Sequence, residues 1–398
     1  MSTRPSEQKS RIVRLVSSGR AAIRGIVRPG ARRVVRFLTW MLPALSGLFL
    51  AAISNERRLL LVYDTFSQPF NIGDILIMQE GSLVLRERHG IDQVDFAVVY
   101  DPQHPAAEDP AFSSITEGNA LYYLASILPV AQVNQHLGSL FLFNSHRNLE
   151  RFIADHADYY QVWPSGWKFG SRAYLYYEVF NDLLYDHYKK HGSIPLLTCR
   201  QFLAEWARAF FAEHVQPLVP VTVNVRNNPN FHTHRNLRLE CWLEFFRHCE
   251  ARYPAKFVIV CARAEIDERL RELPNVILAK DHHTGIEQDL ALIHSSAIHM
   301  GAGSGPASMA WFTDKPYLMV NTAYGPGYFA HPEMILQEAE NIQRFWFSGP
   351  LQRIAGGIET TELLVEEFAR MWASVDIARW RSPPNDERRP SSGFNWLR

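Results

Sequence analysis

The sequence has little of what marks secreted, metal-binding or nucleic-acid-binding proteins. Its 398 residues include only four cysteines, which form no C-x-x-C pair and no recognisable disulfide framework. This pattern favours reduced, buried or half-buried thiols and a reducing compartment. No N-x-[ST] sequon occurs, which argues against a glycosylated luminal protein. The formal net charge is zero, so we expect the molecule as a whole not to bind nucleic acid.

Metal-site motifs are also missing, although 16 histidines are present. The densest pairs are His232 with His234 and His282 with His283. No H-E-x-x-H motif and no acid-rich partner spacing accompanies them. We therefore expect no metal site and no cofactor. His234 stays a candidate contact for a phosphate or an acceptor.

The amino-terminal residues hold an excess of positive charge, followed by an apolar run. Residues 1–36 contain ten Lys or Arg and one acid, Glu7. Residues 37–53 carry no charge and would span about 25 Å as a helix, just short of a hydrocarbon core. A basic interfacial anchor on anionic lipid, a short spanning helix and a cleaved signal peptide are all open interpretations. We expect residues 1–57 to form a helical membrane-associating segment at the cytoplasmic face of the inner membrane, with a single-span protein as the alternative.

Beyond this segment, short apolar runs alternate with stretches of helical periodicity. RLLLVYDT (58–65) and DQVDFAVVYDP (92–102) read as buried strands, and VTVNVR (221–226) restarts the alternation after a proline-containing linker. PYLMVN (316–321) is expected to be the last strand. Strands that alternate with helices predict right-handed crossovers and parallel sheets, with ligands at the carboxyl ends of the strands.

The predicted fold is therefore α/β, with two doubly wound Rossmann-like domains that face a cleft. The predicted divisions are 1–57 for the membrane-associating segment, 58–216 for the first domain, 217–350 for the second domain, 351–381 for a C-terminal helix and 382–398 for a mobile tail.

A turn almost bare of side chains follows the apolar run AIHM. Gly301, Gly303 and Gly305 can take positive φ and allow close backbone approach. Ser304 can cap the helix that Pro306 begins. Free N–H groups at a helix start attract anions, above all phosphate, so we predict a bound phosphate or sugar. The motif is neither G-x-G-x-x-G nor a P-loop, and a tight turn without a ligand is the alternative.

The segment DLALIHSSAIHMGAGSGPASMAWFTDKPYLMVN resembles the donor site of GT-B glycosyltransferases. It is most similar to the heptosyltransferase group, glycosyltransferase family 9, which has D-S-G-P, a helix and then x-K-P. S-G-P at 304–306 and K-P at 315–316 match those motifs. Gly303 stands where the family keeps an acid that helps to hold the donor.

Two further stretches carry the resemblance. FNIGDILIMQEG resembles the loop after that family's first strand, and Gly73-Asp74 stands where the family keeps its proposed catalytic base. Polysaccharide pyruvyl transferases carry a very similar loop on the same fold. VTVNVRNNPNFHTHRN resembles the phosphate-binding strand end of fucosyltransferase-like GT-B enzymes at Arg226. Its R…H-R-N pattern also resembles poorly characterised bacterial polysaccharide glycosyltransferases.

The resemblance implies metal-independent transfer of a sugar from a nucleotide sugar to a lipid-linked or cell-surface glycan acceptor. Arg226 would grip the diphosphate with its guanidinium, and the N–H groups of residues 303–307 would bind the other side. Asp74 would take the proton of the acceptor. The alternative roles are a surface or interdomain salt bridge for Arg226 and the cap of a helix at 75–88 for Asp74.

The remaining predictions concern donor and acceptor contacts. Trp163 and Trp167 could stack on a sugar ring, with core packing as the alternative. Glu287 begins a helix, where an acid also offsets the helix dipole. The predicted donor-binding residues are Gly301, Gly303, Ser304, Gly305, Pro306, Asn228, His234, Lys280 and Glu287, and the acceptor-binding residues are Gly73, Trp163 and Trp167. The expected partners are a nucleotide sugar, a glycan or glycolipid acceptor and an anionic membrane surface. A pyruvyl transferase-like enzyme and a non-catalytic, membrane-recruited GT-B-like binding protein are the alternative functions.

Overall fold

The computed structural model describes residues 57–68, 71–104, 118, 120–170, 175–229, 233–325 and 329–381. Two compact units divide the chain, Met1–Arg57 and Arg58–Arg398, and every element below belongs to the second unit. The predicted membrane-associating segment, apart from Arg57, and the predicted tail at 382–398 lie outside the described residues. In the part of the chain that is described, no helix is both long and apolar enough to cross a bilayer.

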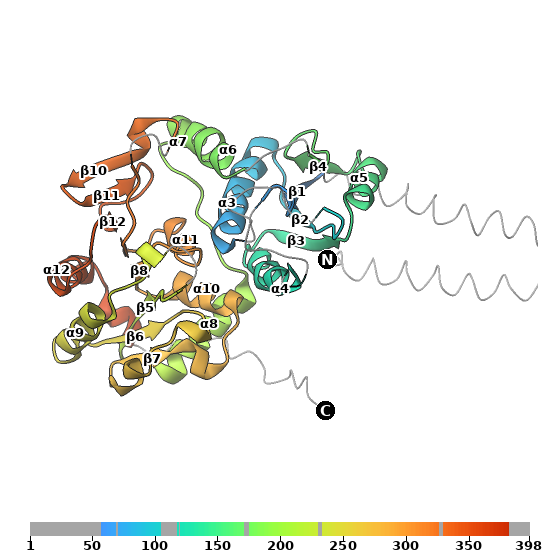
Figure 1. The fold of residues 1–398 in the computed structure, drawn as a ribbon. Coiled ribbons are helices and arrows are strands. Elements are labelled where there is room, and N and C mark those ends of the chain that lie inside the picture. The colour runs from blue at the N-terminus through green and yellow to red at the C-terminus, as the bar shows by residue number, and fades with distance from the viewer. Residues whose placement is uncertain are drawn as a thin grey trace, which may run out of the picture. The chain divides into compact units, whose positions relative to one another are not determined.

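The first sheet has four parallel strands in the order β3-β2-β1-β4 (Figure 1). Its strands are β1 (Arg58–Asp64), β2 (Val94–Val99), β3 (Leu137–Phe143) and β4 (Tyr160–Trp163), and its helices are α3 (Ile72–His89), α4 (Ala120–Ala131) and α5 (His146–Asp155). Alternate residues of β1 enter different cores, because successive side chains of a strand point to opposite faces. Leu59, Leu61 and Tyr63 pack with α3 and α4, whereas Leu60 and Val62 pack with α5. The sheet is therefore covered on both faces, which explains its unbroken apolar runs.

Helix α3 begins at an asparagine cap and ends at a glycine. The Asn71 side chain accepts a hydrogen bond from the Gly73 N–H at 2.8 Å. Gly90 takes the left-handed conformation, with φ of 63°, and closes the helix. Asp74 lies in the first turn of α3, so the alternative interpretation of Asp74 as the helix cap is wrong.

A helical stretch connects the two sheets. It comprises α6 (Tyr176–Glu178), a π-helix η3 (Val179–Leu184), α7 (Tyr185–His191) and α8 (Gln201–His214). The π-helix packs closely against α3, where a Cβ on Gly81 would lie 3.0 Å from the Val179 side chain. This packing ties the connecting segment to the first sheet.

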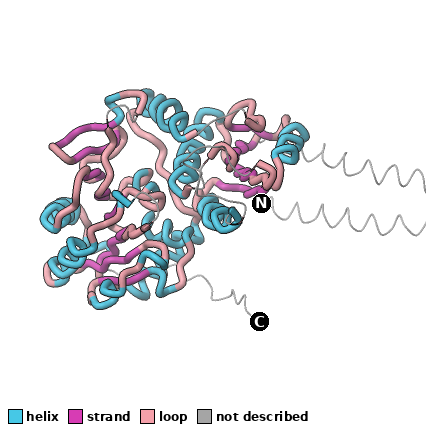
Figure 2. Tube along the Cα trace, viewed as in Figure 1, coloured by secondary structure: helices cyan, strands magenta, loops and turns pink. Residues whose placement is uncertain are grey.

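The second sheet has eight strands in the order β10-β11-β12-β9-β8-β5-β6-β7, in which six neighbouring strands are parallel and β11 pairs antiparallel with both β10 and β12. Helices, cyan in Figure 2, lie beside its magenta strands. The strands are β5 (Val219–Asn224), β6 (Ala255–Ile259), β7 (Val276–Leu278), β8 (Ile298–Ala302), β9 (Tyr317–Val320), β10 (Ile335–Ala339), β11 (Ile342–Phe345) and β12 (Gln352–Ala355). The helices are α9 (Leu239–Glu250), α10 (Ile286–Ser295), α11 (Ser308–Trp311), α12 (Thr361–Trp372) and α13 (Ile377–Arg381). The parallel strands confirm the prediction of an α/β protein with parallel sheets.

The expectation that PYLMVN is the last strand is wrong, because three strands follow it. β10 has the sequence ILQEA with an exposed end, and β12 has only four residues, so neither forms the long apolar run that the prediction relied on. β12 pairs with β9 in parallel and extends the sheet past residue 350.

The two sheets share one apolar core. Tyr63 of the first sheet and Tyr317 and Phe345 of the second belong to the same buried cluster, which α3, α4, α8, α10 and α11 complete. All four cysteines are free thiols, three buried and Cys241 half-buried, as predicted.

Candidate functional site

In both sheets, the order in which successive strands are added reverses beside the first strand. β1 lies between β2 and β4, and β5 lies between β6 and β8. In open parallel sheets, ligands bind outside the carboxyl ends of the strands at such a switch point. The fold therefore offers two ligand positions, one at β1/β4 and one at β5/β8.

The small-residue turn lies at the β5/β8 switch point. Gly301 pairs with Asn224 across the two strands and has φ of 141°. A Cβ on Gly301 would lie 2.4 Å from the Asn224 carbonyl oxygen, so only glycine fits there. A Cβ on Gly303 would lie 2.8 Å from the Thr322 Cβ. The close approach predicted for these glycines is therefore to neighbouring backbone and side chains of the same sheet.

Ser304 fixes the turn to β5. Its hydroxyl donates to the Asn224 Oδ1 at 2.5 Å, and the Asn224 Nδ2 donates to the Val260 carbonyl at 2.8 Å. The helix that follows is short, and its first residue is Ser308. The expectation that Ser304 caps this helix with its side chain is therefore wrong, because the hydroxyl is used across the sheet.

The turn offers fewer N–H groups than its sequence suggests. The Gly303 N–H donates to Val320 and the Ala307 N–H donates to Ser304, while Pro306 has no N–H. Those of Ser304 and Gly305 have no acceptor among the described residues. Two backbone donors therefore remain for an anion.

Arg226 lies at the same switch point, two residues beyond the end of β5. Its side chain is half-buried, and its carbonyl accepts from the Leu237 N–H at 3.0 Å. Burial lowers the pKa of Arg226, the Glu265 carboxylate opposes that shift, and Arg235 adds to it. Arg235 and Glu265 are therefore the charged neighbours that act on the Arg226 guanidinium. The structure thus brings Arg226 and the turn to the carboxyl ends of adjacent strands.

The loop after Arg226 is held by asparagines. The Asn228 N–H donates to the Asn236 Oδ1 at 3.0 Å, and the Asn236 Nδ2 donates to the Asn228 carbonyl at 2.8 Å. Asn321, which follows β9, donates to the Asn236 carbonyl at 2.8 Å. His234 is exposed in a single turn of 3-10 helix in this loop. The loop that contains Asn228 and His234 is therefore held to the end of β9 through Asn236.

Lys280 and Glu287 serve the start of α10. The Lys280 Nζ lies 2.6 Å from the Asp289 Oδ2 and donates to the Thr284 carbonyl at 2.8 Å. Burial raises the pKa of Asp289 to about 6, against the opposing effect of Lys280. The Glu287 carboxylate lies over Gly285, where a Cβ would be 2.8 Å away. Lys280 thus has partners at this helix start and Glu287 lies beside Gly285, and donor binding by both stays a prediction.

The amino end of α3 meets the turn. A Cβ on Gly305 would lie 2.9 Å from the Ile72 Cβ and 3.0 Å from the Gly73 nitrogen. A Cβ on Gly73 would lie 3.2 Å from the Ser308 Oγ. Of the predicted residues, Gly73 and Gly305 are therefore in direct contact across the two sheets.

Asp74 follows Gly73 and is buried, with 5% of its surface exposed. It lies close to Tyr63, near the end of β1. Burial and the Asp74 charge raise the pKa of Tyr63. Asp74 is thus placed between the β1/β4 switch point and the turn.

Trp163 and Trp167 are both buried, with 6% of each side chain exposed. Trp163 packs in the large core with α3 and α4, and Trp167 packs in the smaller core with α5. The structure supports the alternative role of core packing for both, and acceptor binding by them stays a prediction.

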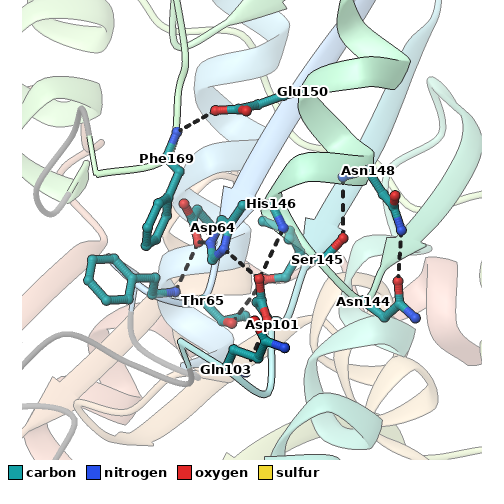
Figure 3. Close-up of polar contacts among 12 residues, drawn as sticks. Asp64, Thr65, Asp101, Gln103, Asn144, Ser145, His146, Asn148, Glu150 and Phe169 are labelled. Carbon is teal, nitrogen blue, oxygen red and sulfur yellow. Dashed lines mark hydrogen bonds and ion pairs between the residues drawn. The ribbon is translucent and has the colours of Figure 1, made fainter.

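Sequence reasoning missed three residues at the β1/β4 switch point, Asp64, Asp101 and His146 (Figure 3). The His146 Nε2 lies 2.9 Å from the Asp64 Oδ1, and its Nδ1 lies 3.1 Å from the Asp101 Oδ2. Burial favours the neutral imidazole, but pairing with Asp64 and then Asp101 outweighs it and raises the pKa of His146. In the sequence, each of these residues stands at or just after the end of an apolar run. Asp64 ends RLLLVYD, Asp101 ends VVYD and His146 ends FLFNSH.

Among the described side chains, no group of three or more His, Cys, Asp or Glu residues is arranged to hold a metal ion. His232 lies outside the described residues.

The chain is similar in fold to solved glycosyltransferases. A glycosyl transferase family 9 protein from Veillonella parvula has a TM-score of 0.46 at 11% identity, over 80% of this chain and 90% of that one. The ADP-heptose LPS heptosyltransferase II of E. coli has a TM-score of 0.47 at 12% identity, over 81% and 100%. Fucosyltransferase NodZ from Bradyrhizobium has a TM-score of 0.29 at 12% identity, over 66% and 94%. No family model and no curated protein matches the sequence. Similarity at this level does not decide an activity, so the function proposed below rests on the geometry of this chain.

Proposed function

We propose that the protein is a nucleotide-sugar-dependent glycosyltransferase that acts on a glycan or glycolipid acceptor. The observation that carries the proposal is the pairing of Asn224 with Gly301 in neighbouring strands. Arg226 follows one of these strands and the small-residue turn follows the other. A guanidinium and two backbone N–H groups supply the charge and hydrogen bonds that a leaving diphosphate needs.

In this proposal Asp74 accepts the proton of the acceptor hydroxyl. The acceptor oxygen forms a bond to the anomeric carbon of the donor, and the bond from that carbon to the diphosphate oxygen breaks. The diphosphate leaves with the electron pair and is stabilised by Arg226. The contact between Gly73 and Gly305 supports this role, because it holds Asp74 close to the turn.

The proposal includes a cleft between the carboxyl ends of the two sheets, with the acceptor on residues 58–216 and the donor on the second sheet. It also includes metal independence, since Arg226 provides the positive charge that a metal ion would otherwise supply. Activity that persists in EDTA is the expected result, and complete loss in EDTA with recovery on adding Mg²⁺ would contradict it.

We also propose that residues 1–57 bring the enzyme to the cytoplasmic face of the inner membrane, where a lipid-linked acceptor is within reach. Flotation of the full chain with vesicles tests this. We expect stronger binding to anionic than to neutral vesicles, and loss of that difference when the five arginines from Arg20 to Arg36 at every fourth position are changed to glutamate. Equal binding to both vesicle types would contradict an electrostatic anchor.

A nucleotide-release assay tests the proposed activity. The full chain is mixed with UDP-, GDP-, ADP- and CMP-sugars, with and without a glycolipid extract as acceptor. We expect one nucleotide to be released faster when the extract is present. Nucleotide binding without release from any sugar would favour the non-catalytic alternative, and pyruvate transfer from phosphoenolpyruvate would favour the pyruvyl transferase alternative.

A further inference from the structure

One imidazole connects the loops that follow all four strands of the first sheet. Asp64 ends β1, Asp101 follows β2, and His146 begins the helix after β3. Phe169, in the loop after β4, packs on the imidazole with ring centroids 4.0 Å apart (Figure 3). Loops positioned by a rigid sheet are where binding residues are commonly found.

The distances fit a charged His146. A neutral imidazole has one N–H and can donate to one carboxylate only. Here each ring nitrogen lies within hydrogen-bond distance of a different aspartate oxygen, as a ring that donates from both nitrogens would. Burial of the side chain opposes the charge, but pairing with Asp64 and Asp101 outweighs it and raises the pKa of His146, so the surroundings favour an imidazolium between two carboxylates.

Each aspartate also orders its own loop. The Asp64 Oδ1 accepts from the Phe66 N–H at 3.0 Å, and the Asp101 Oδ1 accepts from the Gln103 N–H at 3.0 Å. On the β4 side, the Phe169 N–H donates to the Glu150 carboxylate at 3.3 Å. The ion pairs and these bonds hold the loops after all four strands in one arrangement.

This arrangement displays aromatic rings at the surface. Phe169 is 36% exposed, His104 is exposed and Phe66 is half-buried. The Phe169 ring lies 4.8 Å from His104 at 37° and 4.9 Å from Phe66 at 63°. We call these three residues the aromatic surface. Phe66 follows β1 and Phe169 follows β4, the two strands of the switch point where a ligand of this sheet is expected, and His104 follows the neighbouring strand β2.

The charges around the aromatic surface are mixed. Asp64, Asp101 and exposed Glu150 are negative, while His146, exposed Arg147 and exposed Lys168 are positive. A surface without an excess of positive charge favours a neutral sugar over a diphosphate. A sugar ring presents C–H groups that pack on an aromatic face, and its hydroxyls can bond to the charged side chains around it.

We propose that Phe66, His104 and Phe169 form the binding surface for a sugar ring of the acceptor, and that His146 is the positioning residue beneath it. This inference rests on the proposed glycosyltransferase function. It assigns the acceptor to the β1/β4 switch point and leaves the nucleotide at β5/β8.

Binding measurements on the full chain test the proposal. Saturation-transfer NMR with methyl glycosides of common hexoses and with glycan fragments from the same extract reports sugar binding, and calorimetry with UDP, GDP, ADP and CMP reports nucleotide binding. For Phe169→Ala we expect about tenfold weaker sugar binding and unchanged nucleotide affinity. Phe169→Tyr keeps an aromatic face and should retain sugar binding. Phe202→Ala on α8, another exposed phenylalanine, is the matched control.

The positioning role of His146 has its own readout. In His146→Gln we expect the acceptor KM to rise several-fold with kcat nearly unchanged, because the rings shift while the reacting groups do not. A several-fold fall in kcat with an unchanged acceptor KM would overturn the positioning role.

The outcomes separate this inference from the proposed function. If Phe66→Ala and Phe169→Ala bind sugars as tightly as the wild type, the sugar-binding role of the aromatic surface is overturned. This holds even if the protein binds and releases nucleotide. If Phe169→Ala weakens nucleotide binding, the aromatic surface contacts the nucleotide base, and the proposed sugar-binding role is overturned as well. If the wild type binds sugars through Phe169 but no nucleotide, the aromatic surface stands and the glycosyltransferase proposal fails.

Discussion

The two switch points have the same topology and different chemistry. At β1/β4 the chain places Asp64, Asp101, His146 and aromatic rings. At β5/β8 it places glycines and the guanidinium of Arg226, with Arg235 and Glu265 as charged neighbours. Sheet topology therefore determines where ligands approach, and side chains determine which ligand each position can accept.

The two positions are also held together differently. The β1/β4 loops are held by side-chain ion pairs around His146. The β5/β8 turn is held by backbone approach, since Gly301 lies directly against Asn224. The first arrangement should respond to pH, and the second should respond to added side-chain volume.

The largest expected effect is the loss of kcat in Asp74→Asn, because Asp74 lies between the two positions and is the proposed base. Asp74→Asn removes the base and should lower kcat by about a hundredfold to ten-thousandfold, with little change in sugar or nucleotide affinity. Steady-state kinetics with separate binding measurements check this. Asp92→Asn, an exposed aspartate before β2, is the control. Retained kcat in a folded Asp74→Asn variant would leave Asp74 with a structural role only.

Added volume should break the β5/β8 position selectively. Gly301→Ala forces a Cβ against the Asn224 carbonyl and an alanine into positive φ, so we expect a loss of about 2 kcal/mol or more in unfolding free energy. Urea unfolding measures it. Gly325→Ala adds the same methyl group where nothing lies within 4 Å and should be nearly neutral. Equal stability of the two variants would contradict the close approach.

Arg226→Ala should separate the two positions in binding. Loss of one charged contact to a diphosphate is expected to weaken nucleotide binding about tenfold to a hundredfold, and sugar binding should not change. Calorimetry on the full chain measures both. Arg252→Ala, an exposed arginine after α9, is the control. If both arginine variants bind nucleotide like the wild type, Arg226 does not contact the diphosphate.

The smallest expected effect is the pH dependence at β1/β4. The pKa of His146 is raised, so its contribution to stability is fully present below its unfolded pKa of about 6.5 and is lost as pH rises through the folded pKa. Burial opposes the shift for Asp101, but hydrogen bonds from Gln103 and His146 lower its pKa, so its contribution is lost only in acid. Asp64, Asp101 and His104 face the imidazole from the neighbouring loops.

Unfolding free energies of wild type and His146→Gln from pH 5 to pH 9 check this dependence. The difference between the two proteins should be greatest at the acid end and shrink towards pH 9. A difference that grows with pH would contradict an imidazolium between two carboxylates.

Local sequence patterns predicted strands of both sheets and the turn, but not β10, β11 and β12. Unbroken apolar runs identified β1, β2 and β5, and glycine spacing placed the turn after β8. These features depend on residues close in sequence, so periodicity and turn chemistry reveal them. The position of Arg226 after β5 followed from the same reading.

The His146 contacts could not be predicted, because they join residues far apart in the chain. His146 is 82 residues from Asp64 and 45 from Asp101. Only the strand order β3-β2-β1-β4 brings their strand ends together. The burial of Trp163 and Trp167 also depends on packing against helices elsewhere in the chain. The cap at Asn71 was missed because Asp74 in the same segment is an equally suitable residue type.

Binding of a nucleotide-sugar diphosphate at the β5/β8 switch point can be measured by calorimetric titration of the full chain with UDP, GDP, ADP and CMP, using wild type, Arg226→Ala and Phe169→Ala. We expect one nucleotide to bind the wild type and Phe169→Ala equally and to bind Arg226→Ala at least tenfold more weakly. Binding that is the same in all three proteins, or no binding of any nucleotide to the wild type, would contradict this expectation.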